Sequence, residues 1–228
     1  MGRLWYNFEK RSAAQVRGDA HEAGGWSLMT PSDGLCLFGG TFDPPHVGHL
    51  MMAEVARETL GVRHVAFIPA AVPPHKPAVG IAPLADRVAM VREAIADFPD
   101  FVLSTVEAQR PGPSYTVDTV RFFLAQGRRP LFLLVGADML EDFPNWREAD
   151  ELGRLLTVVA APRPGKDLSA LAAEHSGRYG QSPVSLEMPG LDIASSWIRR
   201  RIAADLRVEP LLPVGVWRII KERGMYRS

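Results

Sequence analysis

Short apolar runs alternate with longer segments of helical spacing from residue 35 almost to the end of the chain. The apolar runs occupy residues 35–38, 64–69, 101–107, 130–136, 157–163 and 184–189. Apolar residues at helical spacing cover residues 47–60, 84–96, 117–126, 195–206 and 214–224, and two more helical regions follow residues 136 and 163. Strands that alternate with helices form right-handed βαβ crossovers. The pattern predicts an α/β fold, a single Rossmann-like domain with a mostly parallel sheet flanked by helices on both faces.

The first 33 residues lack this pattern. They mix charges of both signs, include the pair Gly24-Gly25 and show no sustained apolar period. Segments of this kind cannot bury enough apolar surface to fold. We interpret residues 1–33 as a disordered N-terminal extension, with Met29 as a candidate second start, and residues 34–228 as the domain. A transit peptide is the weaker alternative, because acidic residues interrupt the basic ones.

Composition and charge exclude several classes of protein. The 26 basic and 26 acidic residues balance, so the chain has no global attraction for nucleic acid or an anionic membrane, and an anion site must be local. No apolar stretch reaches the roughly 18 to 20 residues of a membrane helix. The only cysteine, Cys36, lies in an apolar run and has no partner for an intrachain disulfide, which favours the cytoplasm. The sequence carries no signal for an oligomeric state.

The stretch GGTFDPPHVGHL, residues 39–50, joins the first predicted strand to the first predicted helix. Ligands of parallel α/β sheets bind at the carboxyl ends of the strands. Gly39 and Gly40 allow a phosphate or ribose to approach the backbone, and two prolines stiffen the loop. His46 and His49, three residues apart, are expected to face the same way on the first turn of the helix, where free N–H groups favour anions.

Two ordinary loop histidines are the plain alternative to a phosphate site. Glycines, prolines and an HxGH pair together at the first strand-to-helix junction are far more specific than an isolated GxGxxG, which the chain lacks at this turn. A dinucleotide oxidoreductase is therefore disfavoured.

The HxGH pair resembles the signature of a superfamily of nucleotidyltransferases, which transfer a nucleoside monophosphate from a nucleoside triphosphate and release pyrophosphate. Other segments narrow the resemblance: IPAAVPPHKP, SYTVDTV, VGADML, NWREADEL, APRPG, IASSWIRRRI and LLPVGVWRIIKERGMY. They follow the order and spacing of the bacterial nicotinate mononucleotide adenylyltransferases over roughly residues 34–227. The resemblance implies that ATP reacts with nicotinate mononucleotide to give deamido-NAD and pyrophosphate.

The resemblance also implies roles for the phosphate-binding residues. Catalytic roles fall to His46, His49 and Arg199, and further ATP contacts to Gly39, Gly40, Asp138, Arg163, Ser195 and Ser196. In IASSWIRRRI, Ser195 is the expected N-cap, Ser196 the start of a helix, and Arg199 projects from its first turn. Ala194 and Ser196 stand where the family usually has serine and threonine, which removes one hydroxyl.

Two of these residues follow predicted strands. Arg163 is expected to face the nucleotide from the carboxyl edge of the sheet. Asp138 fits an acceptor for a ribose hydroxyl, with a plain helix N-cap as the alternative.

For nicotinate mononucleotide the resemblance implies contacts from Gly40, Thr41, Lys76, Tyr115, Thr116 and Trp146. The indole of Trp146 would stack on the pyridine ring, while main-chain N–H groups near Thr116 would receive its carboxylate. Core packing is the alternative for Trp146. Lys76, with His75, lies in a proline-rich loop that suits a phosphate clamp. Trp197 and Trp217 are assigned to packing.

No carboxylate cluster or Cys/His set predicts a dedicated metal site. Mg²⁺ would arrive with ATP, held largely by phosphate oxygens. The expected partners are therefore ATP and nicotinate mononucleotide, without nucleic acid or membrane.

Other functions stay open at this point. Nicotinamide mononucleotide could be the acceptor. An adenylyltransferase for phosphopantetheine, or a cytidylyltransferase, would share HxGH but should lack PPHK, SYT and Trp146. A flavin-forming enzyme would normally carry a kinase domain, for which the chain has no room. A noncatalytic module would bind ATP without releasing pyrophosphate, against which the intact His46, His49 and Arg199 argue.

Overall fold

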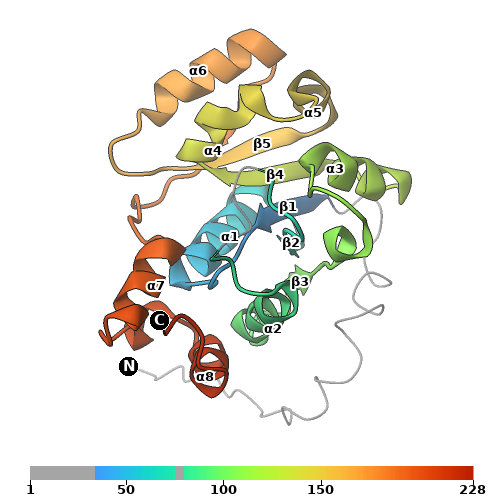
Figure 1. Cartoon of the computed structure of the whole chain (residues 1–228). Helices are drawn as coiled ribbons and strands as arrows, with labels where there is room; N and C mark the ends of the chain where they lie inside the picture. The colour runs from blue at the N-terminus through green and yellow to red at the C-terminus, as the bar shows by residue number, and fades with distance from the viewer. Residues whose placement is uncertain (1–33, 75–79, 228) are drawn as a thin grey trace, which may run out of the picture. The chain divides into compact units, whose positions relative to one another are not determined.

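The sheet is parallel throughout. The computed structural model describes residues 34–74 and 80–227, which contain six strands in the order β3-β2-β1-β4-β5-β6 (Figure 1). The strands are β1 (Leu35–Gly40), β2 (His64–Pro69), β3 (Phe101–Leu103), β4 (Leu131–Gly136), β5 (Thr157–Ala161) and β6 (Val184–Ser185). Every neighbouring pair is parallel. The predicted α/β fold is confirmed.

Helices connect the strands. They are α1 (Val47–Leu60), α2 (Leu84–Ala94), α3 (Thr116–Ala125), α4 (Ala137–Asp142), α5 (Ala149–Leu155), α6 (Leu168–Tyr179), α7 (Ser195–Ala203) and α8 (Val214–Glu222). The described part of the chain also contains the 3₁₀ turns η3 (Val106–Gln109), η4 (Phe143–Asn145) and η5 (Glu209–Leu211). Right-handed crossovers put α1 and α2 on one face of the sheet and α3 to α6 on the other.

The two edge strands are much shorter than the apolar runs indicated, whereas β5 lacks only the last two residues of its run. The run 101–107 was predicted as one strand, but β3 stops at Leu103 and η3 takes up the rest. The run 184–189 was also predicted as a strand, but β6 contains only Val184–Ser185. Both lie at an edge of the sheet, where a strand has a single neighbour to pair with, so pairing and not apolar content sets the length.

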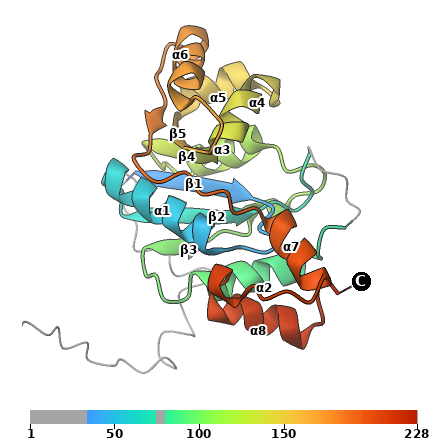
Figure 2. The ribbon, with the colours of Figure 1, turned by 90° about the vertical axis from the view of Figure 1, so that its left-hand side faces the viewer.

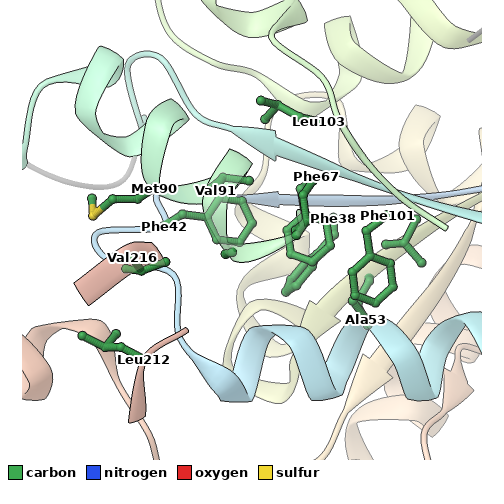
Figure 3. Packing of buried hydrophobic residues seen from close by; sticks show 14 of the residues in the cluster. Phe38, Phe42, Ala53, Phe67, Met90, Val91, Phe101, Leu103, Leu212 and Val216 are labelled. Carbon is green, nitrogen blue, oxygen red and sulfur yellow. The ribbon is translucent and has the colours of Figure 1, made fainter. Parts of the chain in front are cut away.

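Aromatic rings fill the layer between α1 and the middle of the sheet (Figure 3). The ring centroids of Phe38 and Phe67 lie 5.3 Å apart, and those of Phe67 and Phe101 also 5.3 Å. Ala53 and Ala56 are the fully buried residues that α1 presents here, and their small side chains let the helix approach the rings. Cys36 is fully buried in the same core, and burial raises the pKa of its thiol to about 12.

The helix α8 lies beside α2 in both views (Figures 1 and 2). It buries Val216, Ile219 and Ile220, and Arg218 pairs with Glu93 of α2 at 2.6 Å. This packing brings the last described residues back toward the loop that follows β1. The strand order reverses between β1 and β4, which is where α/β sheets open a ligand crevice.

Candidate active site

The two histidines of HxGH lie together at the start of α1. The helix begins at Val47 with His46 as its N-cap, and the two imidazole centroids are 3.8 Å apart. The expected geometry of the pair is confirmed. The backbone N–H of His46 donates to Nδ1 of His49 at 3.1 Å. Because Nδ1 of His49 accepts, the proton of the neutral ring lies on Nε2.

His46 is much more buried than a loop histidine usually is. Only 5 % of its surface is exposed, and its Nδ1 has no hydrogen-bond partner among the described residues. Burial, with a smaller contribution from the positive charge of Arg163, lowers the pKa of His46 to about 4. At neutral pH the ring is therefore uncharged, and it serves as a hydrogen-bonding group.

The glycine inside HxGH has a steric purpose that the sequence reasoning missed. A Cβ at Gly48 would lie 3.0 Å from Nδ1 of His46, closer than side chains normally come. The glycine therefore leaves room for the His46 ring. The signal was present in the sequence, as the residue between the two histidines.

The two glycines at the end of β1 differ in their surroundings. A Cβ at Gly40 would lie 3.0 Å from the ring of Phe42, which is buried and has a φ of 50° (Figure 3). Gly39 is exposed, with nothing within 4 Å of the position of a Cβ. Gly40 thus makes room for an aromatic ring of the core, and Gly39 is the member of the pair with open space for a ligand.

The second predicted phosphate site begins one residue earlier than expected. Ser195 was predicted as the N-cap, but Ala194 is the N-cap and Ser195 is the first residue of α7. The reason is that the Ser195 hydroxyl donates to the carbonyl oxygen of Pro44 at 2.9 Å instead of capping the helix. Ser196 is exposed.

Arg199 joins α7 to the loop after β1. Its Nη1 donates to the carbonyl oxygen of Asp43 at 2.7 Å. With the bond from Ser195 to Pro44, this places the start of α7 against the loop that leads into His46. The structure therefore brings the two predicted phosphate sites together.

Asp138 and Arg163 pair with each other. Nη1 of Arg163 lies 2.8 Å from Oδ2 of Asp138, and Nη2 lies 3.6 Å from Oδ1 of Asp192. Arg163 follows the end of β5, as expected. Asp138 lies in the first turn of α4, whose N-cap is Gly136, so the alternative prediction of an N-cap is wrong.

Tyr115 and Thr116 form the start of α3, and Arg147, the residue after Trp146, contacts Tyr115. Tyr115 is the N-cap and Thr116 the first residue of this helix. The guanidinium of Arg147 lies 4.5 Å from the centre of the Tyr115 ring, which holds the segment after η4 against α3. Trp146 is half-buried, 5.2 Å from Phe143, and its indole N–H is buried with no partner among the described residues.

The two tryptophans that were assigned to packing, Trp197 and Trp217, differ in burial. Trp217 packs against the hydrophobic core, as predicted. Trp197 is 38 % exposed, so its assignment to packing is wrong. The buried stripe of α7 consists of Ile198 and Ile202, and Trp197 lies off it, 5.1 Å from the Arg201 guanidinium.

The loop after β2 contains the predicted Lys76, together with His75. Both lie outside the described residues. The residues just before them are held in place, because the N–H groups of Ala71 and Val72 donate to the Ser114 hydroxyl at 2.9 and 3.2 Å. The carbonyl oxygen of Thr41 accepts from the buried Arg87 at 2.9 Å. Ser114 and Arg87 are positions that the sequence reasoning missed.

Asp43 is the most informative residue missed. Only 2 % of its surface is exposed, and its Oδ2 atom lies 3.5 Å from Nη1 of Arg199. Its position before two prolines in TFDPP was the available signal. Within residues 34–74 and 80–227, no group of three or more His, Cys, Asp or Glu side chains is arranged to hold a metal ion. In the same ranges no helix is long and apolar enough to cross a membrane.

Comparison with known proteins defines the class. Residues 37–201, more than half of the chain, match the sequence model of the cytidylyltransferase-like family. The chain belongs to the cytidylyltransferase-like nucleotidyltransferases.

The curated relatives define the particular member. The chain is 42% identical to a Bacillus pumilus protein named "Probable nicotinate-nucleotide adenylyltransferase", over 84% of this chain and 97% of that one. A Gloeobacter violaceus protein of the same name is 43% identical over 84% of this chain and 95% of its own length. At this identity and coverage, the chain is a member of the nicotinate-nucleotide adenylyltransferase family.

Solved structures agree on the fold. The structure of Plasmodium falciparum nicotinic acid mononucleotide adenylyltransferase complexed with NaAD matches with a TM-score of 0.72 and 16% identity, over 85% of this chain and 97% of that chain. A second structure of that protein, complexed with APC, has a TM-score of 0.69 at 15% identity.

Proposed function

We propose that this enzyme transfers AMP from ATP to nicotinate mononucleotide, and that the residues around HxGH, α7 and the start of α3 bind the two substrates. The observation that carries the proposal is the pair of imidazoles 3.8 Å apart at the start of α1, joined through Asp43 and Pro44 to the start of α7. Two helix N-termini and a guanidinium directed at one place suit a polyphosphate.

The reaction needs little covalent help from the protein. An oxygen of the mononucleotide phosphate attacks the α-phosphorus of ATP, a new P–O bond forms, the bond to the bridging oxygen breaks, and pyrophosphate leaves. The attacking phosphate is already anionic at neutral pH, so no general base is required. Catalysis consists of alignment and of stabilising the charge that develops on the α-phosphoryl group and the leaving group.

The site residues supply donors for that charge. The Nε2–H of His49 would donate to an α- or β-phosphate oxygen, with the ring held by the bond from the His46 backbone. His46, which is neutral and buried, would add a second imidazole donor through its one N–H group. A bound polyphosphate would raise the pKa of His46 and so oppose the effect of burial. Arg199 carries a permanent positive charge and its side chain is 30 % exposed, so it can reach the phosphates.

The nucleoside part of ATP would occupy the edge formed by Gly39, Asp138 and Arg163. Gly39 is exposed and offers open space beside the backbone. The Arg163–Asp138 pair would open toward the ligand, with the carboxylate accepting from a ribose hydroxyl and the guanidinium facing phosphate.

Nicotinate mononucleotide would be held on the other side of the crevice. Trp146 would stack on the pyridine ring, and the free N–H groups at the start of α3, near Thr116, would bind its carboxylate. Tyr115, Gly40, Thr41 and Lys76 complete the assignment. A carboxamide would not satisfy those N–H groups as well as a carboxylate, so the acid is the preferred acceptor.

Magnesium belongs with the substrate in this proposal. The donor set does not fit a resident metal ion, because the Asp43 carboxylate is engaged by Tyr226 and Arg199 and the described residues hold no ligand cluster. Mg²⁺ enters bound to the ATP phosphates, whose charge it partly neutralises. The enzyme works in the cytoplasm, consistent with one buried cysteine, and without nucleic acid or membrane.

The decisive experiment measures pyrophosphate release with ATP and each of four acceptors. These are nicotinate mononucleotide, its amide, phosphopantetheine and flavin mononucleotide. We expect turnover with the acid mononucleotide to exceed turnover with the other three. Comparable turnover with phosphopantetheine or flavin mononucleotide, or ATP binding without pyrophosphate release, would overturn the proposed acceptor or the proposed catalysis respectively.

A further inference from the structure

The Asp43 carboxylate lies beside the proposed phosphate site, yet it points away from solvent. One oxygen, Oδ1, accepts from the Tyr226 hydroxyl at 2.6 Å. The other, Oδ2, lies 3.4 Å from the N–H of Ala82 and 3.5 Å from Nη1 of Arg199. A buried carboxylate is stable only when its oxygens are paired. These three partners together compensate for the burial of the carboxylate.

Those partners come from distant parts of the chain. Arg199 belongs to α7, Ala82 lies just before α2, and Tyr226 follows α8. The nearby Arg87 donates to the carbonyl oxygens of Thr41 and Ala82 at 2.9 and 3.0 Å. It thereby connects the loop after β1 to the residues just before α2. Tyr226 is thus the contribution of the C-terminal segment to the first loop of the site.

Tyr226 is suited to a fixed, proton-donating role. Its ring packs against the hydrophobic core, and α8 is held on α2 by Arg218–Glu93 and Arg223–Asp86. Burial, followed by the adjacent Asp43, raises the pKa of the Tyr226 hydroxyl above its usual range. The hydroxyl therefore keeps its proton and donates to Asp43.

We infer that Tyr226 is a positioning residue for phosphate transfer: its hydroxyl orients the Asp43 carboxylate, and through Asp43 it orients the Arg199 guanidinium and the loop leading to His46. The inference rests on the proposed function, in which Arg199 stabilises charge on the phosphates. Arg199 is bound to Asp43 twice, at the carbonyl oxygen and near the carboxylate, so a shift of Asp43 is passed directly to it. A misplacement of about 1 Å in a group that stabilises the transition state can cost on the order of a hundredfold in rate.

The test compares two tyrosines that each lose only a hydroxyl. Tyr226→Phe removes the bond to Asp43. Tyr179→Phe is the matched control, because the Tyr179 hydroxyl is also buried but lies on α6, with no hydrogen-bond partner among the described residues. We expect Tyr226→Phe to lower kcat/KM for ATP about tenfold, mostly in kcat, and to leave KM for nicotinate mononucleotide unchanged. Tyr179→Phe should stay within about twofold of the wild type.

A double mutant separates positioning from a general structural role. In an Arg199→Ala background, Tyr226→Phe should cost clearly less than it does in the wild type, because one of the two groups that it orients is gone. Kinetics are measured well below each Tm, so that loss of folded protein does not enter. A Tyr226→Phe enzyme within twofold of the wild type, or full additivity with Arg199→Ala, would overturn the inference.

The two proposals fail in different ways. If the wild type is active and Arg199→Ala is not, but Tyr226→Phe is normal, only the inference falls. If the wild type releases no pyrophosphate with any acceptor, the proposed function falls, and calorimetric binding of ATP becomes the readout of the inference. Tyr226→Phe should then weaken ATP about threefold relative to Tyr179→Phe, and equal affinities would overturn the inference. If Tyr226→Phe does not fold, Asp43→Asn, which keeps the shape but loses the charge, replaces it in the same comparison.

Discussion

The two halves of the proposed site are held in different ways. The phosphate half is fixed by buried groups: His46, Asp43 and Arg87 are each at most 5 % exposed. Arg87 donates to backbone carbonyl oxygens, and the Asp43 carboxylate accepts from the Tyr226 hydroxyl. The acceptor half is held by ion pairs at the protein surface. Arg121 bridges α3 to Glu148 and Glu151, and the three side chains are 43 %, 38 % and 33 % exposed.

This difference has a physical consequence. Buried hydrogen bonds are strong and costly to disturb, so the phosphate half is preorganised to stabilise the charge that develops during the transfer. Exposed ion pairs contribute about 0 to 1 kcal/mol each and rearrange readily. We therefore expect the proposed phosphate half to be the more rigid one and the proposed acceptor half to adapt more readily. The predictions below test this contrast.

The largest effect is expected in the phosphate half, at His49. His49→Ala should lower kcat on the order of a hundredfold or more, because one donor to the transition state is lost. It also removes the acceptor for the His46 backbone N–H, which costs roughly 1 kcal/mol of stability. His49→Asn, with an oxygen that can accept that bond, is the control for the cap. Activity within about twofold of the wild type in either variant would remove His49 from catalysis.

The burial of His46 should appear as pH-dependent stability. Its pKa is about 4 in the folded protein and about 6.5 when unfolded, so the unfolded state binds the extra proton between these values. The free energy of unfolding should be insensitive to this group above about pH 7 and fall by up to about 3 kcal/mol as the pH drops toward 4.

Denaturant titrations of the wild type and His46→Gln at pH 7 and pH 4.5 check this. The variant should lose clearly less stability on acidification than the wild type does. His175, whose pKa burial also lowers, contributes equally to both proteins and cancels in the comparison. Parallel pH curves would show that His46 is not buried as described.

Trp146 tests the adaptable half. Trp146→Ala should lower kcat/KM for nicotinate mononucleotide by about five- to a hundredfold, because stacking and burial of the ring are worth roughly 1 to 3 kcal/mol. KM for ATP should change little. Thermal unfolding is the control, since a tryptophan of the core cut to alanine costs roughly 3 to 5 kcal/mol. A variant that melts early but uses the acceptor normally would make Trp146 a core residue.

The smallest effect distinguishes two neighbouring serines. Ser195→Ala breaks the bond to Pro44 and should cost about 1 kcal/mol of stability, with a loss of a few-fold in kcat. Ser196→Ala removes an exposed hydroxyl and should leave the Tm unchanged while raising KM for ATP a few-fold. Equal melting of the two variants would mean that the bond across to Pro44 contributes nothing to holding α7.

The alternation of apolar runs and helical segments was enough to predict the parallel sheet. HxGH was enough to predict where α1 starts and that its two histidines face the same way. These properties depend on periodicity and on spacing along one helix, which are local. The family resemblance located Arg199 and Trp146 in the same way, by position in the chain.

Only the tertiary structure decided what surrounds those residues. The short edge strands β3 and β6 depend on a single neighbour in the sheet, and the start of α7 depends on the Pro44 carbonyl, 151 residues away in sequence. Likewise, the low pKa of His46 follows from its burial. The need for glycine at position 48 follows from the orientation of the His46 ring, and the contact of Tyr226 with Asp43 follows from the packing of α8 on α2. Each depends on the distance between groups that are far apart in the chain, and no pattern of residue types along one segment contains that distance.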